Sequence, residues 1–220
     1  MSVAVITVSH PLSVTVIKYH RVMSRWKPDA RGRLGRAAME LYAERGFEQT
    51  TVAEIAERAG LTERTFFRHF ADKREVLFEG SAELAASLVA GVGDAPVGAA
   101  PIEMVAAALR SIAPIFADRR PFARARQALI AAHPDLQERE LIKLATLATS
   151  LASALHDRGV GEPDASLAAE AGIAVFRIGF GRWIAGPDAG PDLGEVMTGL
   201  FGSLRAVTAA GVGDDCGGQQ

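Results

Sequence analysis

The sequence predicts an all-α protein in two parts, an N-terminal three-helix bundle that holds a helix-turn-helix and a larger C-terminal helical domain. Aromatic residues make up only 6% of the 220 residues while alanine is abundant, a balance that favours helix. Apolar residues recur at helical spacing along most of the chain, and no alternating pattern typical of a strand occurs beyond residue 22. Hydrophobic residues make up 49% of the chain, which is enough for a sizeable core.

The first helix is predicted from Ala30 to Arg45. Gly46 ends this helix, and Phe47 is expected to pack back onto it. Its apolar stripe consists of Leu34, Ala37, Ala38, Leu41 and Tyr42.

Two short helices joined by a tight turn are predicted next, and this layout is that of a helix-turn-helix. Thr51 and Glu54 form a capping box at the start of the first of them. Gly60 follows its last turn, where a positive φ costs least for glycine, and Thr62 can cap the second helix. The inner faces consist of Val52, Ile55, Ala56, Ala59, Phe66 and Phe70.

A second capping box, Asp72 with Glu75, predicts a fourth helix from about Lys73 to Val89. Residues 91–101 are rich in glycine and proline and should form a flexible break. Pro114 falls inside a helical pattern and should kink or shorten its helix. The later helices are predicted at about 102–117, 120–132, 135–157, 164–184 and 192–210.

Composition narrows the class of protein. The single cysteine, Cys216, allows no disulfide within one chain, which fits a reducing cytoplasm. No apolar run reaches the ~20 residues of a membrane helix, so no membrane partner is expected. Residues 1–80 hold 13 Lys and Arg against 10 Asp and Glu, whereas residues 81–220 hold 11 against 16. The modest basic excess therefore lies in the half that carries the helix-turn-helix, where phosphates would bind.

The helix-turn-helix resembles the DNA-binding region of the tetracycline-repressor (TetR) family of bacterial regulators. The resemblance covers roughly residues 30–78 and has no gaps. In the family, a tyrosine usually stands where this chain has Phe67, and its hydroxyl commonly reaches a phosphate; that hydrogen bond cannot form here. The matching residues are Gly46-Phe47, Thr50-Thr51-Val52, Ile55-Ala56, Ala59-Gly60, Thr62, Thr65, Phe67, His69-Phe70 and Lys73.

The resemblance divides the chain into a DNA-binding domain at residues 27–80 and a ligand-binding and dimerisation domain at residues 81–210. Residues 1–26 are interpreted as a disordered or misassigned extension, and residues 211–220 as a disordered tail. The alternative for the extension is an arm that touches DNA or another subunit. The basic residues beside it, which could follow phosphates or stay solvated, are Arg25, Lys27, Arg31, Arg33 and Arg36.

The second helix of the motif, from Thr62 to Phe70, is the expected recognition helix. Arg64 can bind guanine through its fork of donors and Thr65 can contact thymine, whereas Glu63 either accepts from cytosine or only complements the helix end. For Thr51 the alternative is a cap only, and for His69 it is packing between helices. The candidate DNA-binding residues are Thr50, Thr51, Glu63, Arg64, Thr65, Phe67, Arg68, His69 and Lys73.

The C-terminal half carries no catalytic signature, such as HExxH, CxxC, GxSxG or a Walker loop, so no enzyme is expected. His133 and His156 stand beside Asp135 and Asp157, but both pairs fit helix ends better than a metal or catalytic site. No cofactor or metal is therefore predicted.

The family resemblance implies that the last two helices pair with those of a second subunit. Ile173, Phe176, Phe180, Val196, Leu200 and Leu204 could fill that seam, and the alternative is burial inside one subunit. The small residues that would let helices approach closely are Ala168, Ala169, Ala171, Gly172, Ala174, Gly179, Gly181, Gly199 and Gly202.

A small, largely apolar effector is expected among the helices of residues 102–157. Arg124 and Arg126 are possible anchors for an acidic group of this ligand, or they are solvated. The candidate ligand-binding residues are Leu109, Ile112, Phe116, Phe122, Arg126, Leu129, Leu144, Leu147 and Leu151.

These observations predict a homodimeric repressor that binds a palindromic operator and is released by a ligand. The alternative is a helical ligand-binding dimer with weak or non-specific DNA binding, which the absent Phe67 hydroxyl keeps open. An enzyme with an incidental helix-turn-helix lacks catalytic motifs, and an architectural DNA-binding protein would need a larger basic excess.

Overall fold

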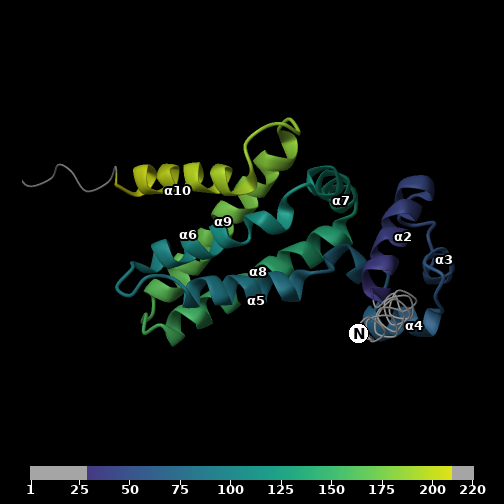
Figure 1. Ribbon diagram of the computed structural model, residues 1–220, viewed down its shortest axis with the longest axis horizontal. Helices are drawn as coiled ribbons and strands as arrows, with labels where there is room; N and C mark the ends of the chain where they lie inside the picture. Colours follow the sequence, from purple (N-terminus) through teal and green to yellow (C-terminus); the bar gives the residue numbers. More distant parts are fainter. Residues whose placement is uncertain (1–28, 210–220) are drawn as a thin grey trace, which may run out of the picture. The chain divides into compact units, whose positions relative to one another are not determined.

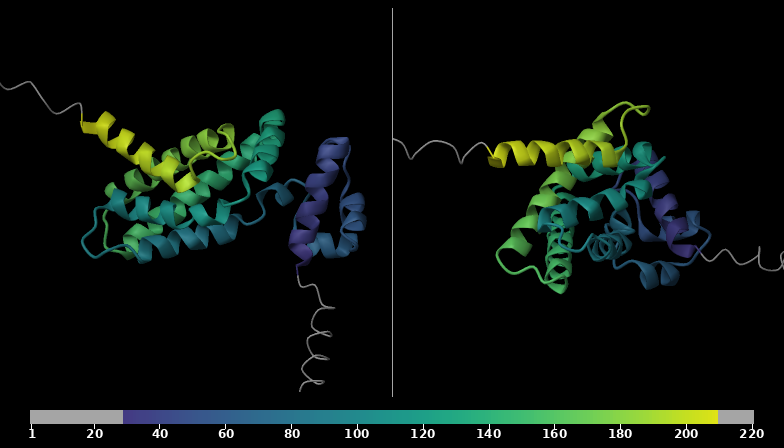
Figure 2. Two further views of the ribbon diagram at one scale, coloured as in Figure 1. Left: turned by 45° about the horizontal axis from the view of Figure 1, so that its top comes forward. Right: turned by 60° about the vertical axis from the view of Figure 1, so that its left-hand side comes forward.

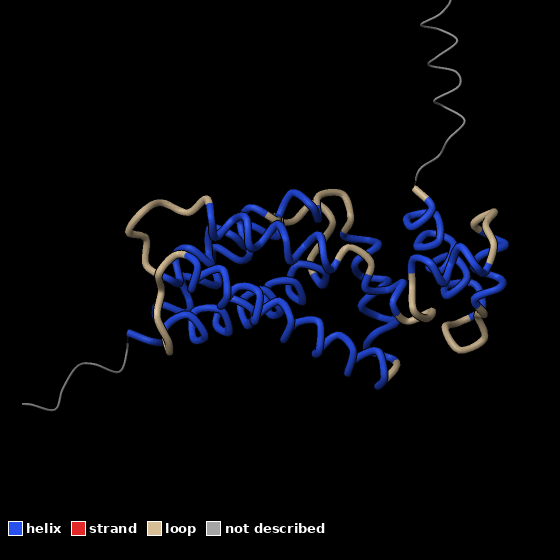
Figure 3. The backbone as a smooth tube through the Cα atoms, turned by 90° about the horizontal axis from the view of Figure 1, so that it is seen from below, coloured by secondary structure: helices blue, strands red, loops and turns tan. Residues whose placement is uncertain are grey.

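The computed structural model describes residues 29–209, and within them every regular element is a helix (Figures 1 and 3). The predicted extension and tail, including Arg25 and Lys27, lie outside the described residues. The chain divides into two compact units, with the boundary between Leu77 and Phe78. They are called the N-terminal unit and the C-terminal unit below.

From residue 29 onward, the N-terminal unit has three α-helices around one small core. They are α2 (Ala30–Arg45), α3 (Val52–Arg58) and α4 (Glu63–His69), and α2 packs against both others. The fully buried side chains of this core are Leu34, Leu41, Ile55 and Phe66.

Local capping sets the boundaries of these helices as the sequence predicts. The Thr51 hydroxyl accepts from the Glu54 backbone N–H at 3.3 Å, and the Glu54 carboxylate accepts from the Thr51 N–H at 2.9 Å. Thr62 caps α4 by accepting from the Thr65 N–H at 3.2 Å. Gly60 has φ +65°, the left-handed conformation that a turn of this type requires. The capping box at Thr51 and the start of α2 at Ala30 are both confirmed.

The predicted continuous helix from Lys73 to Val89 is wrong. The chain forms a 3-10 turn, η1 (Glu75–Phe78), and then a separate helix, α5 (Ser81–Gly93). The Asp72 carboxylate does cap the turn, since it accepts from the N–H groups of Arg74 at 2.8 Å and Glu75 at 3.0 Å. Gly80, with φ +84°, then interrupts the helix.

Segment Glu75–Gly93 has the length and mean hydropathy, 1.3, of a membrane span by composition alone. The prediction that no apolar run is long enough for a membrane helix therefore does not hold for this segment by composition. In the structure this segment is not one helix, because Gly80 divides it. Helix α5 is 13 residues long, roughly 20 Å, against a hydrocarbon core of about 30 Å. One face of α5 packs against α6 and α8.

As far as residue 209, the C-terminal unit has six α-helices, and their predicted bounds agree with the structure to within a few residues, apart from α5 and α6. Pro114 has the predicted effect: α6 ends at Ser111 and a 3-10 turn takes its place. After α5 the elements are α6 (Pro101–Ser111), η2 (Ala113–Phe116), α7 (Arg120–Ala132), α8 (Pro134–Asp157), α9 (Asp164–Ala185) and α10 (Leu193–Ala209).

Helix α6 lies at the centre of the C-terminal unit, in contact with α5, α8, α9 and α10 (Figures 1 and 2). Its neighbours approach closely because they carry glycine at the contacts. A Cβ on Gly91 of α5 would lie 2.7 Å from the Cα of Ala108, so only glycine fits there. The core between these helices is fully apolar, with Val105, Leu109 and Ile112 completely buried.

Candidate nucleic-acid interface

The turn between α3 and α4 is fastened to α2. The Arg33 guanidinium donates to the carbonyl groups of Ala59 and Gly60, which end α3. These carbonyls have no partner within their own helix, so the bonds satisfy them and hold the turn. Arg33 therefore stabilises the motif.

Helix α4 turns its apolar side chains inward and its charged side chains outward, in the phase that the sequence predicts. Phe66 is fully buried and Phe70 nearly so. Glu63, Arg64 and Arg68 are exposed. Within residues 29–209 the structure shows no ion pair to Arg64 or Arg68, so both guanidinium groups are available to a ligand.

Phe67 is the unusual residue of this outer face, because 55% of it is exposed. Its ring packs edge-on against Phe66, with centroids 5.5 Å apart. The ring offers apolar contact only, where a tyrosine would add a hydroxyl.

Thr65 and Thr62 share a local hydrogen bond, with their hydroxyl oxygens 3.0 Å apart. Thr65 is half-buried. Its methyl group and the remaining hydrogen-bonding capacity of its hydroxyl are available to a ligand. Thr51 is exposed, but its hydroxyl is already engaged with Glu54.

The side chain of Thr50 is poorly placed for a phosphate contact. Thr50 is only 1% exposed, and its hydroxyl donates to the Gly46 carbonyl at 2.8 Å. The side chain holds the end of α2 and the following turn together.

Lys73 also has internal partners, and it does not start an α-helix as predicted. Its ammonium donates to the carbonyls of Phe47 at 2.9 Å, Glu48 at 3.1 Å and Thr50 at 3.1 Å, and lies 4.5 Å from the Phe47 ring centroid. The buried Tyr42 hydroxyl donates to the Lys73 carbonyl at 2.7 Å, and burial raises the pKa of Tyr42 well above its usual range. A phosphate contact by Lys73 would compete with these bonds.

His69 is half-buried at the end of α4. Its Nε2 is inaccessible to solvent and has no hydrogen-bond partner among the described residues. The buried Nε2 favours the alternative, packing between helices, and a backbone contact by His69 stays a prediction.

Ion pairs on the other helices of the N-terminal unit neutralise most of the remaining charge. Arg58 binds Glu44 through two bonds, at 2.8 and 2.9 Å, and this hydrogen bonding lowers the pKa of Glu44. Arg45 pairs with Glu54 at 2.6 Å, while hydrogen bonds from Thr51 are the main cause that lowers the pKa of Glu54. The outward arginines of α4 are therefore the prominent unneutralised cations of the motif.

The residues predicted to bind an effector lie partly in the core and partly at the surface of the C-terminal unit, and their role stays a prediction. Leu109, Ile112, Leu147 and Leu151 are buried in the core of the C-terminal unit. Phe122 is 49% exposed, and Leu129 and Leu144 are half-buried. Phe116 joins an aromatic cluster with Phe176, Phe180 and Trp183.

The two candidate anchoring arginines both have partners in the protein. Arg126 pairs with Glu140 at 3.3 Å and lies 5.1 Å from the Phe78 ring centroid, and burial lowers its pKa. Arg124 donates to the carbonyls of Ile184 at 2.8 Å and Gly186 at 3.0 Å. Both side chains therefore hold α7 against neighbouring elements.

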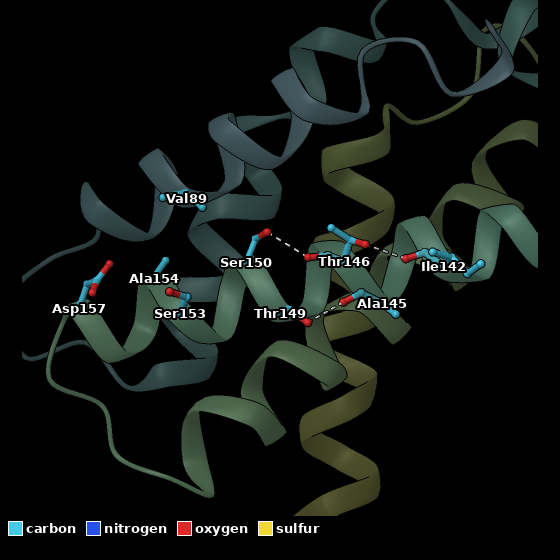
Figure 4. Close-up of a pocket in the computed structure, with 9 residues that line it drawn as sticks. All are labelled: Val89, Ile142, Ala145, Thr146, Thr149, Ser150, Ser153, Ala154 and Asp157. Carbon is cyan, nitrogen blue, oxygen red and sulfur yellow. Dashed lines mark hydrogen bonds between the residues drawn. The ribbon is translucent and has the colours of Figure 1, made fainter. Parts of the chain in front are cut away.

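A groove between α5 and α8, of about 650 Å³, contains none of the predicted effector residues (Figure 4). The sequence pattern does not indicate this groove, because its lining is small and partly hydroxylic, not bulky and apolar. The signal available in the sequence was the run of Ala, Ser and Thr between residues 145 and 154. Among the described residues no group of His, Cys, Asp and Glu could hold a metal ion.

Small residues of α9 and α10 divide into two sets. Ala168, Ala169, Gly172 and Gly179 are buried within one chain, which was the alternative to a seam between subunits. In contrast, a Cβ added to Gly181, Gly199 or Gly202 would meet no atom within 4 Å.

Comparison with protein families supports the assignment of a helix-turn-helix and adds a family match for the C-terminal unit. Residues 35–79 match the model for bacterial regulatory proteins of the tetR family, and residues 99–209 match the MftR C-terminal domain. The chain belongs to the TetR family. The expected resemblance is thereby confirmed over both units.

Similar TetR-family and HTH-type regulators are found among characterised proteins. The HTH-type transcriptional regulator TcmR of Streptomyces glaucescens is 38% identical over 82 residues, which cover 37% of this chain and 36% of that protein. The HTH-type transcriptional repressor KstR2 of Mycobacterium tuberculosis is 43% identical over 49 residues, 22% of this chain and 24% of that protein. The matches span about a third or less of these relatives.

Solved structures match over most of the chain. FadR of Thermus thermophilus, a TetR-family transcriptional repressor in complex with lauroyl-CoA, has a TM-score of 0.50 and 26% identity, with 86% of this chain and 99% of that chain covered. FadR of Bacillus subtilis, in complex with stearoyl-CoA, has a TM-score of 0.56 at 20% identity and covers 78% and 96%. The second likeness shows the fold alone.

Proposed function

We propose that this TetR-family protein is a ligand-responsive, sequence-specific DNA-binding repressor that acts as a homodimer in the cytoplasm. The observation that carries the proposal is the outer face of α4, a capped helix on which Arg64 and Arg68 are exposed and have no ion pair among residues 29–209. The relatives whose names describe a function are transcriptional regulators, which supports a regulator over an enzyme.

Base reading is assigned to Arg64 and Thr65, at the N-terminal end of α4, because a recognition helix meets base edges there. Arg64 would bind guanine through two donors, and the Thr65 methyl would contact thymine. Arg68, Glu63, Phe67 and the backbone near Thr51 would lie against the flanking groove and phosphates.

Dimerisation through α9 and α10 is supported by an apolar stripe that the described residues of this chain leave exposed. On α9, Leu167 is 65% exposed and Ile178 is 50% exposed. Ala171, Ala174, Gly181 and Ala185 complete the stripe at intervals of three and four residues. The open space at Gly199 and Gly202 of α10 would admit a second helix closely. A two-fold dimer also matches a palindromic operator.

The effector is proposed to be small and largely apolar. The lauroyl-CoA bound by the Thermus thermophilus FadR makes acyl thioesters the first compounds to test. The effector would lower operator affinity only as far as it prefers the conformation that does not fit DNA. Two recognition helices must meet half-sites about 34–36 Å apart or a multiple of that, so a small shift in the dimer breaks the register.

The test is fluorescence anisotropy with the duplex that a selection from genomic fragments enriches most, measured against a shuffled duplex at ~150 mM salt. Tight binding of two chains to the selected duplex alone is the expected result. Equal, weak binding to both duplexes would support the alternative, a helical ligand-binding dimer with non-specific DNA contacts. The missing hydroxyl at Phe67 is the observation that favours this alternative.

A further inference from the structure

The groove between α5 and α8 runs along the surface of the C-terminal unit (Figure 4). Val89 forms its α5 wall, and the remaining lining comes from one side of α8. The lining residues are Val89, Ile142, Ala145, Thr146, Thr149, Ser150, Ser153, Ala154 and Asp157.

The lining is largely apolar in effect, although five of its nine residues have polar side chains. The hydroxyl of Thr146 donates to the Ile142 carbonyl at 2.9 Å, and that of Thr149 donates to the Ala145 carbonyl at 3.1 Å. Ser150 donates in the same way to Thr146 at 2.9 Å. Because these hydroxyl protons are used within the helix, the groove presents mainly methyl and methylene groups to an occupant.

Charge is confined to one end of the groove. Asp157 is the single ionisable residue of the lining, and it stands in the last turn of α8, where the helix dipole is also negative. The opposite end is apolar, because it presents Ile142, a hydrocarbon side chain that is 58% exposed. A negatively charged group is therefore disfavoured at the Asp157 end.

The size of the groove fits a small molecule and not a protein partner. Nine residues line it, whereas a stable protein interface uses about 20–30 residues on each side. Its volume of about 650 Å³ lies within the usual range of ligand sites, about 300–1,000 Å³. At ~1.5 Å rise per residue, the lining from Ile142 to Asp157 extends over roughly 22 Å, which suits a long unbranched chain.

We propose that the α5–α8 groove binds the hydrocarbon chain of a fatty acyl compound, with the anionic head at the Ile142 end. The groove gives such a chain small side chains to lie against, and three of its four hydroxyl groups already donate within α8. If the proposed repressor function holds, a chain in this groove would act on α5, which follows the N-terminal unit through η1. Binding itself does not depend on that function.

The first test is calorimetric titration of the protein without DNA, using octanoate, decanoate, laurate and palmitate below their micelle concentrations. Each added methylene is expected to tighten binding by roughly twofold to fourfold. Thr149→Gln, which places an amide beneath the chain, should weaken palmitate binding by roughly tenfold. Thr208→Gln is the matched control, because Thr208 is also an exposed helical threonine with its hydroxyl on the carbonyl four residues earlier. Affinity that does not depend on chain length, or equal affinities of the two variants, would overturn the proposal.

The second test concerns the head group and uses Ile142→Lys and Ile142→Glu, which differ only in the sign of one exposed charge. Laurate should bind the lysine variant about threefold to tenfold more tightly than the glutamate variant. Asp157→Asn should change laurate affinity little. Equal affinities at position 142 with tightening by Asp157→Asn would contradict the proposed orientation. Since no DNA is present, failure of these tests is distinguishable from failure to bind an operator.

Discussion

The two units of this chain differ in the range of the interactions that determine their surfaces. In the N-terminal unit, the bonds that cap the short helices, such as Thr51 with Glu54, join residues three positions apart. Its longer bonds, from Arg33 and Lys73, span 23 to 27 residues. In the C-terminal unit, Arg120 bonds to Pro187, 67 residues later, and Arg158 bonds to Val92, 66 residues earlier. A surface built from short-range interactions follows from the sequence pattern, whereas one built from long-range packing does not.

The largest expected effect tests the inner and outer faces of α4. Phe66→Ala should destabilise the N-terminal unit by ~3–5 kcal/mol, because Phe66 is fully buried. Phe67→Ala, one position away and 55% exposed, should cost well under half of that. Hydrogen–deuterium exchange of α3 and α4 measures both. Similar losses in the two variants would show that the assigned phase of the helix is wrong.

A second prediction concerns the long-range contacts of the C-terminal unit. Glu140→Gln removes the carboxylate that pairs with Arg126, at a site where the two side chains are 19% and 25% exposed. The expected cost is about 2 kcal/mol, less than for a fully buried pair. Glu138→Gln, on the exposed side of the same helix, is the control and should be nearly neutral. Urea denaturation provides the comparison, and equal stability of the two variants would mean that the pair contributes nothing.

A third prediction tests the short-range capping of the N-terminal unit. Thr51→Ala removes the N-cap of α3 and should cost ~1 kcal/mol. Thr51→Ser, which keeps the hydroxyl, should retain most of the stability. If urea denaturation finds the alanine and serine variants alike, the capping box does not stabilise this helix.

The smallest expected effect refines the outer face. Phe67→Tyr should strengthen operator binding by roughly 0.5–1.5 kcal/mol if a hydroxyl here reaches a phosphate. Anisotropy titrations of the two proteins on one duplex provide the measurement. Unchanged affinity would mean that the DNA backbone lies beyond the reach of this side chain.

The same contrast explains which features could be predicted. Thr51, Gly60, Thr62 and Pro114 each act through their immediate neighbours, and each has its predicted effect on helix boundaries. Gly80 stands within an apolar run, so the pattern predicts one helix where the structure has a turn and a separate helix.

The internal roles of several candidate site residues depend on distant partners. The Lys73 ammonium reaches carbonyls more than twenty residues earlier, which no local pattern reveals. Leu109 and Leu151 have the apolar spacing of both core and pocket residues, and periodicity alone cannot separate the two. The groove along α8 could not be predicted, because its Ser and Thr residues appear polar in the sequence although three of their hydroxyls donate to carbonyls of the same helix.

The central claim is that the outer face of α4 reads base pairs, and Arg64→Ala tests it most directly. Its affinity should be measured on the selected operator and on operators with single base-pair changes, with Arg110→Ala in the C-terminal unit as the control. The account predicts a loss of ~1–3 kcal/mol on the operator and relaxed discrimination at one base pair. An equal loss on every sequence would contradict base reading by this residue.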